Sequence, residues 1–235
     1  MVSDVVRIMS ETRSQRVSRV LHESGAHAWE RATDHPMVRA IGDGSLPHAV
    51  FRGYFEQNVL YLQDYARAIA LIVAKAPDRD AITTLHRFQG QIVETEIPAN
   101  LRFLERLGGD VTSLGPAGSM RPTTYAYTRH LLATCAQGDC ADGLTAVLPC
   151  QWSYGELARR LLTEHPPADP IYADWIGMFG SDEYDALVAE TTALLDRMAD
   201  VADAVRMAAL TAIFERSTQY EVAFWDMAYG SPEQG

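Results

Sequence analysis

Apolar residues recur at helical spacing along almost the whole chain, and no other feature of the sequence constrains the fold as much. Between residues 11 and 33, for example, Val17, Leu21, Ser24 and Ala28 fall on one face of a helix. The sequence lacks alternating apolar and polar runs bounded by Asn-Gly or Asp-Gly, which are typical of β-hairpins. The pattern therefore predicts an all-α protein, built as a compact bundle of long helices.

Turn signals divide this pattern into separate helices. Ser45 is a candidate N-cap residue, and Pro47 suits the first turn of a helix that is expected to run to about Lys75. Pro98 is expected to kink or break a helical segment over 79–107. Further helices are expected over 122–136, 140–165, 170–179, 182–200 and 201–229.

Length and charge limit the class of protein. A chain of 235 residues that is 47% hydrophobic can bury one substantial core, so we expect one domain over 1–235 with its core at about 15–230. The net charge of −11 would repel phosphates, and we expect neither nucleic acid nor a membrane as a partner. Three cysteines without a secretory leader favour a cytoplasmic location.

The sharpest motif is Leu-Pro-Cys-Gln-Trp-Ser-Tyr-Gly over 148–155. Pro149 lies inside a helical pattern, and its ring crowds the carbonyl of Thr145, so a bend is expected there. Cys150 follows the bend, and Tyr154 lies one turn further along the same face. A thiol beside a phenol is a candidate nucleophile with a hydrogen-bonding neighbour. The alternative is that Cys150 is a small apolar residue of the core.

A second motif places a carboxylate among aromatic residues. Glu221 shares a helix face with Phe224 and Trp225, and Ser217 lies one turn before it. Partial desolvation would raise the pKa of Glu221 toward the range of general acid–base catalysis. The alternative is an exposed glutamate next to a stripe of core aromatics.

Tyrosines and an amide form a third pattern. Asn58, Tyr61 and Tyr65 share one helix face, and Tyr127 in the predicted helix 122–136 is a signal of the same kind. Such a stripe could hold a flat polar heterocycle. It could equally be core whose tyrosine hydroxyls reach the surface.

Ligand sets for metals are missing from the sequence. It contains neither the Glu-x-x-His pairs of di-iron bundles nor a His-x-x-x-His pair, and Glu94-x-Glu96 has the wrong spacing for one helix face. His22 or His27 as a lone haem ligand is an alternative to a solvated or hydrogen-bonded histidine. We expect no metal and no other cofactor.

Two motifs together resemble the thiaminase II (TenA) family. They are Leu-Pro-Cys-x-Trp-x-Tyr-Gly at 148–155 and Glu-x-x-Phe-Trp-Asp-Met-Ala-Tyr at 221–229. The similarity extends through residues 54–62, Tyr127 and the Trp-Ile pair at 175–176, and it covers roughly residues 15–230. The resemblance implies the haem-oxygenase-like all-α fold, usually without haem, and commonly a homotetramer.

The resemblance also implies a reaction and a set of site residues. Cysteine-containing members hydrolyse 4-amino-5-aminomethyl-2-methylpyrimidine to the hydroxymethyl compound and ammonia, and they also cleave thiamin. On this basis Cys150 would add to the pyrimidine ring, Glu221 would transfer protons, and Tyr154 would assist near the thiol. The residues that frame and stack on the ring would be Tyr61, Tyr127 and Phe224.

Two positions depart from the family pattern, and both concern substrate recognition. Asn58 stands where the family usually has an aspartate that holds the amino group and ring nitrogen of the pyrimidine, and Phe179 stands where a tyrosine is frequent. A neutral amide carries no charge to favour a protonated ring. From the sequence alone, we therefore expect Asn58→Asp to raise catalytic efficiency on the aminopyrimidine.

Three functions remain open at this level. The first is hydrolysis of the aminopyrimidine or thiamin in thiamin pyrimidine salvage. The second is a related enzyme that acts on another nitrogen heterocycle in specialised metabolism, and the third is a non-catalytic binding or regulatory protein. Asn58 favours the second or third function, whereas the presence of Cys150 and Glu221 disfavours the third.

Overall fold

The computed structural model describes residues 16–114, 119–164 and 167–230, and the periodic apolar pattern forms helices in each of these ranges. The prediction of an all-α fold is confirmed, because the described residues contain no strand. The helices are α2 (Val17–Ser24), α3 (Ala26–Thr33), α4 (Pro36–Gly42), α5 (His48–Val73), α6 (Arg79–Gly90), η1 (Gln91–Glu96), α7 (Ile97–Arg106), η2 (Val111–Ser113), α8 (Pro122–Gln137), α9 (Cys140–Glu164), α10 (Pro170–Phe179), α11 (Asp182–Met198) and α12 (Ala204–Tyr229).

Three details of the N-terminal part differ from the prediction. The first predicted helix is divided at Gly25 into α2 and α3, and its first residues lie outside the described part. The short helix α4 was not predicted, and the His35 side chain caps it by accepting from the backbone N–H of Met37. Ser45 is not an N-cap residue: α5 begins one residue after Pro47, and the Ser45 N–H donates to Asp43.

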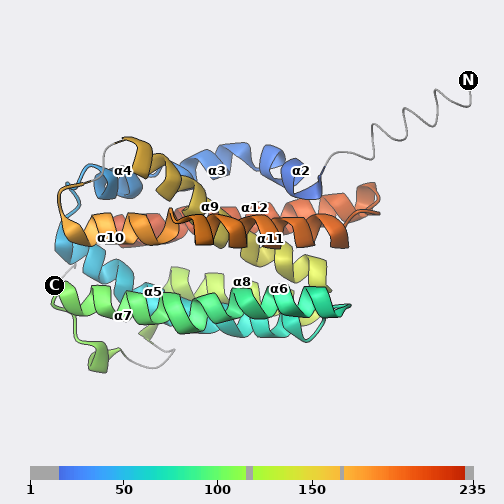
Figure 1. Ribbon diagram of the computed structural model, residues 1–235, viewed down its shortest axis with the longest axis horizontal. Coiled ribbons are helices and arrows are strands. Elements are labelled where there is room, and N and C mark those ends of the chain that lie inside the picture. Colours follow the sequence, from blue (N-terminus) through green and yellow to red (C-terminus); the bar gives the residue numbers. More distant parts are fainter. Residues whose placement is uncertain (1–15, 115–118, 165–166, 231–235) are drawn as a thin grey trace, which may run out of the picture.

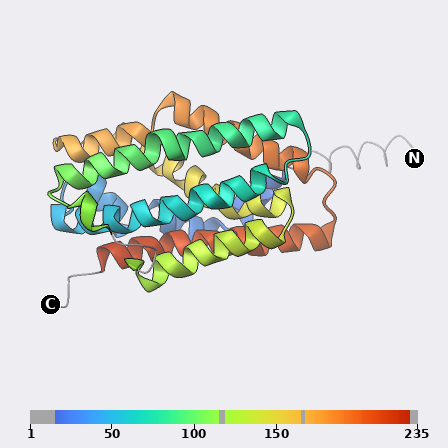
Figure 2. The ribbon, with the colours of Figure 1, turned by 90° about the horizontal axis from the view of Figure 1, so that it is seen from below.

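The break expected at Pro98 takes the form of a widened helical turn. Residues Gln91–Glu96 form the π-helix η1, and α7 continues directly from it. Pro98 lacks an N–H and crowds the carbonyl of Glu94, and a wider turn relieves that crowding. The segments α6, η1 and α7 consequently form one continuous rod beside α5 (Figure 2).

Helix α9 lies at the centre of the arrangement. In Figure 1 the short helices α2, α3 and α4 lie along one side, α5 to α8 lie along the other, and α10, α11 and α12 lie between them. Helix α9 packs against members of all three groups, including α3, α5, α8, α11 and α12. It continues through Pro149 without interruption. Cys150 therefore lies halfway along the most enclosed helix.

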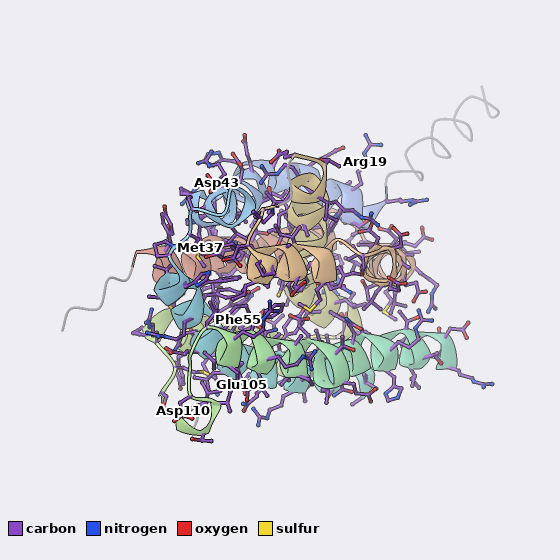
Figure 3. All side chains as sticks on the ribbon, turned by 60° about the vertical axis from the view of Figure 1, so that its left-hand side comes forward. Arg19, Met37, Asp43, Phe55, Glu105 and Asp110 are labelled. Atoms are coloured by element: carbon purple, nitrogen blue, oxygen red, sulfur yellow. The ribbon has the colours of Figure 1, made fainter. Side chains whose placement is uncertain are left out.

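The core of this bundle is rich in aromatic side chains. Phe55 and Met37 lie inside it, whereas Arg19, Asp43 and Glu105 lie at the surface (Figure 3). Among the described helices, none is both long and apolar enough to cross a membrane.

A buried polar contact fixes α9 against α11 next to Cys150. Thr191 Oγ1 of α11 donates to the side-chain oxygen of Gln151 over 2.7 Å, and both residues are buried. The amide nitrogen of Gln151 has no partner within the described residues. Within the described residues, the side chain of Gln151, which directly follows Cys150, is therefore paired through its oxygen alone.

We expect Thr191→Val to lower the free energy of unfolding by about 1–3 kcal/mol, because it leaves a buried amide oxygen without a donor. Thr192→Val is the matched control, because both hydroxyls reach carbonyls of their own helix, α11, but only that of Thr191 also reaches Gln151. Urea unfolding followed by circular dichroism measures both variants. Equal losses in the free energy of unfolding of the two variants would show that the contact with Gln151 adds nothing to stability.

Candidate active site

Cys150 is a buried thiol in the middle of α9, with 9% of its surface exposed. Burial raises the pKa of Cys150 well above 9, and the carboxyls of Glu221 and Glu96 raise it further. The hydroxyls of Tyr61 and Tyr65 act in the opposite direction. Cys150 is therefore protonated at neutral pH, and it needs a base if it is to act as a nucleophile.

Glu221 on α12 is the carboxyl best placed to be that base. It is 2% exposed, and burial raises its pKa from 4.5 to about 7. The Tyr127 hydroxyl, which donates to Glu221 Oε1, and the Cys150 thiol lower this pKa, because hydrogen bonding to the carboxylate favours its charged form. A pKa near neutrality allows Glu221 both to accept and to release a proton.

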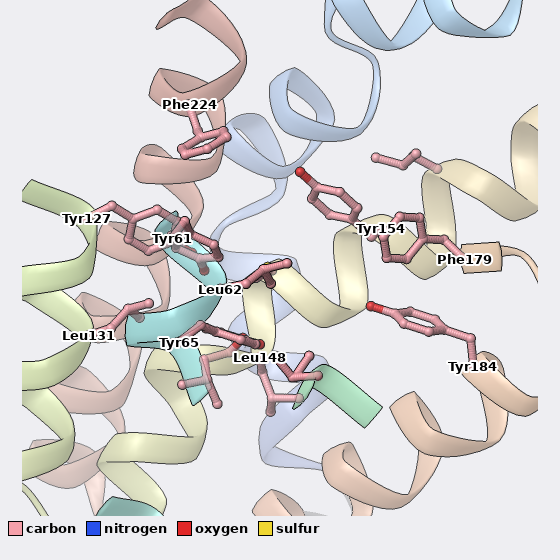
Figure 4. Close-up of a cluster of buried hydrophobic side chains, with 14 of the residues drawn as sticks. Tyr61, Leu62, Tyr65, Tyr127, Leu131, Leu148, Tyr154, Phe179, Tyr184 and Phe224 are labelled. Carbon is pink, nitrogen blue, oxygen red and sulfur yellow. The ribbon is translucent and has the colours of Figure 1, made fainter. Parts of the chain in front are cut away.

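Figure 4 shows two groups of aromatic rings in the core, with Tyr61, Tyr127 and Phe224 in one group and Tyr154, Phe179 and Tyr184 in the other. On one side, the Tyr61 ring lies 5.0 Å from that of Tyr127 and 5.6 Å from that of Phe224. On the other side, the Tyr154 ring lies 5.0 Å from that of Phe179. Burial raises the pKa of all these tyrosines well above 10, and a charge on Cys150 would raise it further. The thiol therefore lies within electrostatic range of both sides.

Tyr54 links the two groups of rings. Its hydroxyl hydrogen-bonds that of Tyr154 over 3.0 Å, and its ring lies 5.9 Å from that of Phe224. The sequence suggested that Tyr154 assists near the thiol, but its hydroxyl is paired with Tyr54. The hydroxyl of Tyr61 is buried and close enough to Cys150 and Tyr127 to lower the pKa of both, but it makes no hydrogen bond of regular geometry within the described residues. A buried unpaired hydroxyl is costly, and it marks a place where a polar ligand would be stabilised.

Asn58 lies on α5, and it is paired with a residue that the sequence did not single out. Its Nδ2 donates to Asn100 Oδ1 of α7 over 2.9 Å. Asn100 Nδ2 in turn donates to the backbone carbonyl of Glu96 over 2.8 Å. All three side chains are buried, so the amide of Asn58 is held from behind by η1 and α7.

Glu96 is a second buried carboxyl near the thiol, and sequence reasoning missed this role. Burial raises the pKa of Glu96 to about 8, with a further contribution from Glu221. It lies in the π-helix η1, and widened turns of this kind are frequent at functional sites. The sequence did contain a signal that Glu96 is buried, because it recurs at helical spacing with three other residues of the buried face, Ile92, Asn100 and Phe103.

The structure brings the predicted residues into one neighbourhood. Contacts or electrostatic interactions connect the following seven: Cys150, Glu221, Tyr127, Tyr61, Phe224, Tyr154 and Phe179. The link to Asn58 is indirect: Asn58 bonds Asn100, which bonds the backbone carbonyl of Glu96, and the Glu96 carboxyl raises the pKa of Cys150. The other two cysteines interact elsewhere, Cys135 with the carbonyl of Gly143 and Cys140 with that of Ile72. The described residues contain no group of three or more His, Cys, Asp or Glu that could hold a metal ion.

Solved structures define the class of protein. A Silicibacter protein described as a TenA family transcription regulator has a TM-score of 0.86 and 28% identity, with coverage of 92% of this chain and 98% of that chain. A Shewanella denitrificans domain described as having a heme oxygenase-like fold has a TM-score of 0.67 at 15% identity, covering 89% of this chain and 90% of that chain. The chain is thus an all-α protein with the haem-oxygenase-like fold.

The chain belongs to the TENA/THI-4/PQQC family, which residues 22–231 match. A relative in Halalkalibacterium halodurans, named aminopyrimidine aminohydrolase, is 35% identical over 213 residues. That match covers 89% of this chain and 93% of the relative.

We expect Tyr127→Phe to raise the pKa of Glu221 above about 7 by roughly one unit, because it removes a donor that favours the carboxylate. Carbon-13 NMR titration of protein labelled at the glutamate carboxyls measures the shift. Tyr54→Phe is the control, since it removes a buried hydroxyl that bonds another tyrosine. An unchanged titration in Tyr127→Phe would contradict the assignment.

We expect Glu96→Gln to stabilise the protein at pH 9 and to have little effect at pH 5. Folding raises the pKa of Glu96 from 4.5 to about 8. The free energy of unfolding of the wild-type protein therefore falls as pH rises through that window, because the folded state binds the proton more tightly than the unfolded state. The gain at pH 9 should be at least about 1.4 kcal/mol, the equivalent of one pKa unit. Chemical unfolding at both pH values measures it. Glu94→Gln, at an exposed position of the same helix, should show no such pH dependence.

Proposed function

We propose that this chain is an aminopyrimidine aminohydrolase of the cysteine-containing thiaminase II class, a hydrolase of C–N bonds in thiamin pyrimidine salvage. The observation that carries the proposal is the buried Cys150 beside Glu221, whose pKa is about 7. The name of the Halalkalibacterium halodurans relative supports the same activity.

Activation of the thiol follows from the electrostatics of the site. Burial and two carboxyls keep Cys150 protonated, so a free thiolate would be scarce. Glu221 in its carboxylate form takes the proton as the sulfur attacks, which avoids two negative charges in a low-dielectric interior. Near neutral pH, a substantial fraction of Glu221 is in that form.

The reaction divides into two displacements. In the first, Cys150 sulfur bonds to a ring carbon of the aminopyrimidine, and the bond between the exocyclic methylene and its nitrogen then breaks. The amine leaves as ammonia with the proton that Glu221 had accepted. In the second, water adds to the methylene carbon and gives up a proton to Glu221. The carbon–sulfur bond breaks, and the thiolate regains that proton.

The surrounding side chains bind the ring. Tyr61, Tyr127 and Phe224 stack on or frame its faces, as expected of an aromatic shell around a flat heterocycle. The Tyr61 hydroxyl, which makes no hydrogen bond of regular geometry within the described residues, would gain one from the ligand. Tyr154 positions Tyr54 through the hydrogen bond between their hydroxyls, and Phe179 supports the Tyr154 ring.

One observation favours a second candidate, which is hydrolysis of a different nitrogen heterocycle in specialised metabolism. Asn58 is neutral, and Phe179 lacks a hydroxyl, so the polar contacts that the site offers differ from those implied by the family pattern. By the same resemblance, we propose that the protein is a cytoplasmic homotetramer of single-domain subunits.

Release of ammonia from 4-amino-5-aminomethyl-2-methylpyrimidine, followed with a coupled ammonia assay, tests the proposal. Cys150→Ala should reduce the rate to background, and Glu221→Gln should reduce it by about 100-fold or more. Cys140→Ala is the matched control on the same helix and should retain activity. An inactive wild-type protein, or an active Cys150→Ala variant, would overturn the proposed function.

A further inference from the structure

The orientation of the Asn58 amide is determined by a chain of hydrogen bonds that begins at a backbone carbonyl. The carbonyl of Glu96 can only accept, so the group of Asn100 that faces it must be the amide nitrogen. Asn100 therefore presents its oxygen to Asn58, which must donate through Nδ2. Asn100 is fully buried, so no exchange with bulk solvent relaxes this order.

The same chain determines what Asn58 has left to offer. Its bond to Asn100 is the only hydrogen bond that the Asn58 side chain makes within the described residues. The side-chain oxygen and the second N–H of the amide remain. Asn58 therefore presents an acceptor beside a donor, whereas a carboxylate at this position would present acceptors alone.

We propose that Asn100 is a positioning residue that holds Asn58 so that it reads the neutral N=C–NH2 edge of an aminopyrimidine. This inference rests on the proposed function and on the family resemblance that places the ring edge at position 58; it adds the role of Asn100 and the direction of the hydrogen bonds. The Asn58 oxygen accepts from the exocyclic amino group, and its N–H donates to the unprotonated ring nitrogen. Asparagine recognises the amino group and adjacent ring nitrogen of adenine with the same pairing.

The relay reverses the expectation that the sequence alone raised for Asn58→Asp. An introduced carboxylate would face the Asn100 oxygen, and Asn100 cannot turn round without placing that oxygen against the Glu96 carbonyl. The carboxylate would meet repulsion or have to take up a proton. Asn58→Asp should therefore weaken aminopyrimidine binding rather than restore it.

Calorimetric binding of two probes tests the inference without requiring turnover. The probes are 4-amino-5-hydroxymethyl-2-methylpyrimidine and the same ring without its amino group. Wild-type protein should prefer the amino compound by about tenfold or more, as expected when an unpaired buried group penalises the wrong ligand. Asn100→Leu should reduce this preference to within about threefold, and Asn58→Asp should weaken binding of the amino compound by about tenfold.

A double-mutant cycle separates positioning from a merely structural role. If Asn100 acts through Asn58, then Asn100→Leu adds no further loss of preference once Asn58→Leu is present. Additive losses in the cycle, tighter binding by Asn58→Asp, or an unchanged preference in Asn100→Leu would each overturn the inference. Should Asn100→Leu fail to fold, the result for Asn58→Asp decides the matter alone.

The outcome is distinguishable from failure of the proposed function. Wild-type protein that releases ammonia while Asn100→Leu keeps its preference would leave the hydrolase intact and refute the relay. Wild-type protein that shows the preference without releasing ammonia, together with loss of the preference in Asn100→Leu, would refute the hydrolase and leave the relay intact. Absence of binding by the wild-type protein would overturn both.

Discussion

Desolvation of ionisable groups is the physical constraint on which the candidate site depends. A thiol and two carboxyls, Cys150, Glu221 and Glu96, share an interior walled by aromatic rings, and burial raises the pKa of each. Each negative charge there makes the next one more costly, so burial favours the protonated forms of these groups. Under the proposed mechanism, this constraint is the reason that Cys150 needs a neighbouring carboxyl as base. It also explains why tyrosine hydroxyls, which donate without becoming charged, fill the surroundings.

The helices supply the rigidity that such an interior requires. The proposed nucleophile, base and ring-recognising amide come from α9, α12 and α5, three long helices that pack against one another. Side chains on packed helices are held more firmly than side chains on loops, which suits groups whose pKa depends on small distances. The π-turn of η1 adds a feature that regular helices do not offer, because it places Glu96 and the start of α7 behind Asn58.

Periodicity was sufficient to predict much of the fold. Helix α10 begins and ends at the predicted residues, and α8 and α9 agree within one residue at each end. The errors fall where turn chemistry was misjudged. Ser45 does not cap a helix; instead, its own backbone N–H donates to the side chain of Asp43. A short helix such as α4 has too few turns to show a periodic pattern, so it escaped notice.

The sequence by itself determined the helical class, the Cys150 and Glu221 motifs and the tyrosine stripe around Asn58, because these depend on spacing along one helix. Only the tertiary structure decided which helices face one another. It brought Tyr127 to Glu221, paired Tyr154 with Tyr54, and placed Asn100 and Glu96 behind Asn58. Burial and hydrogen-bond direction depend on contacts between segments far apart in the chain, so neither can be predicted from spacing along one helix.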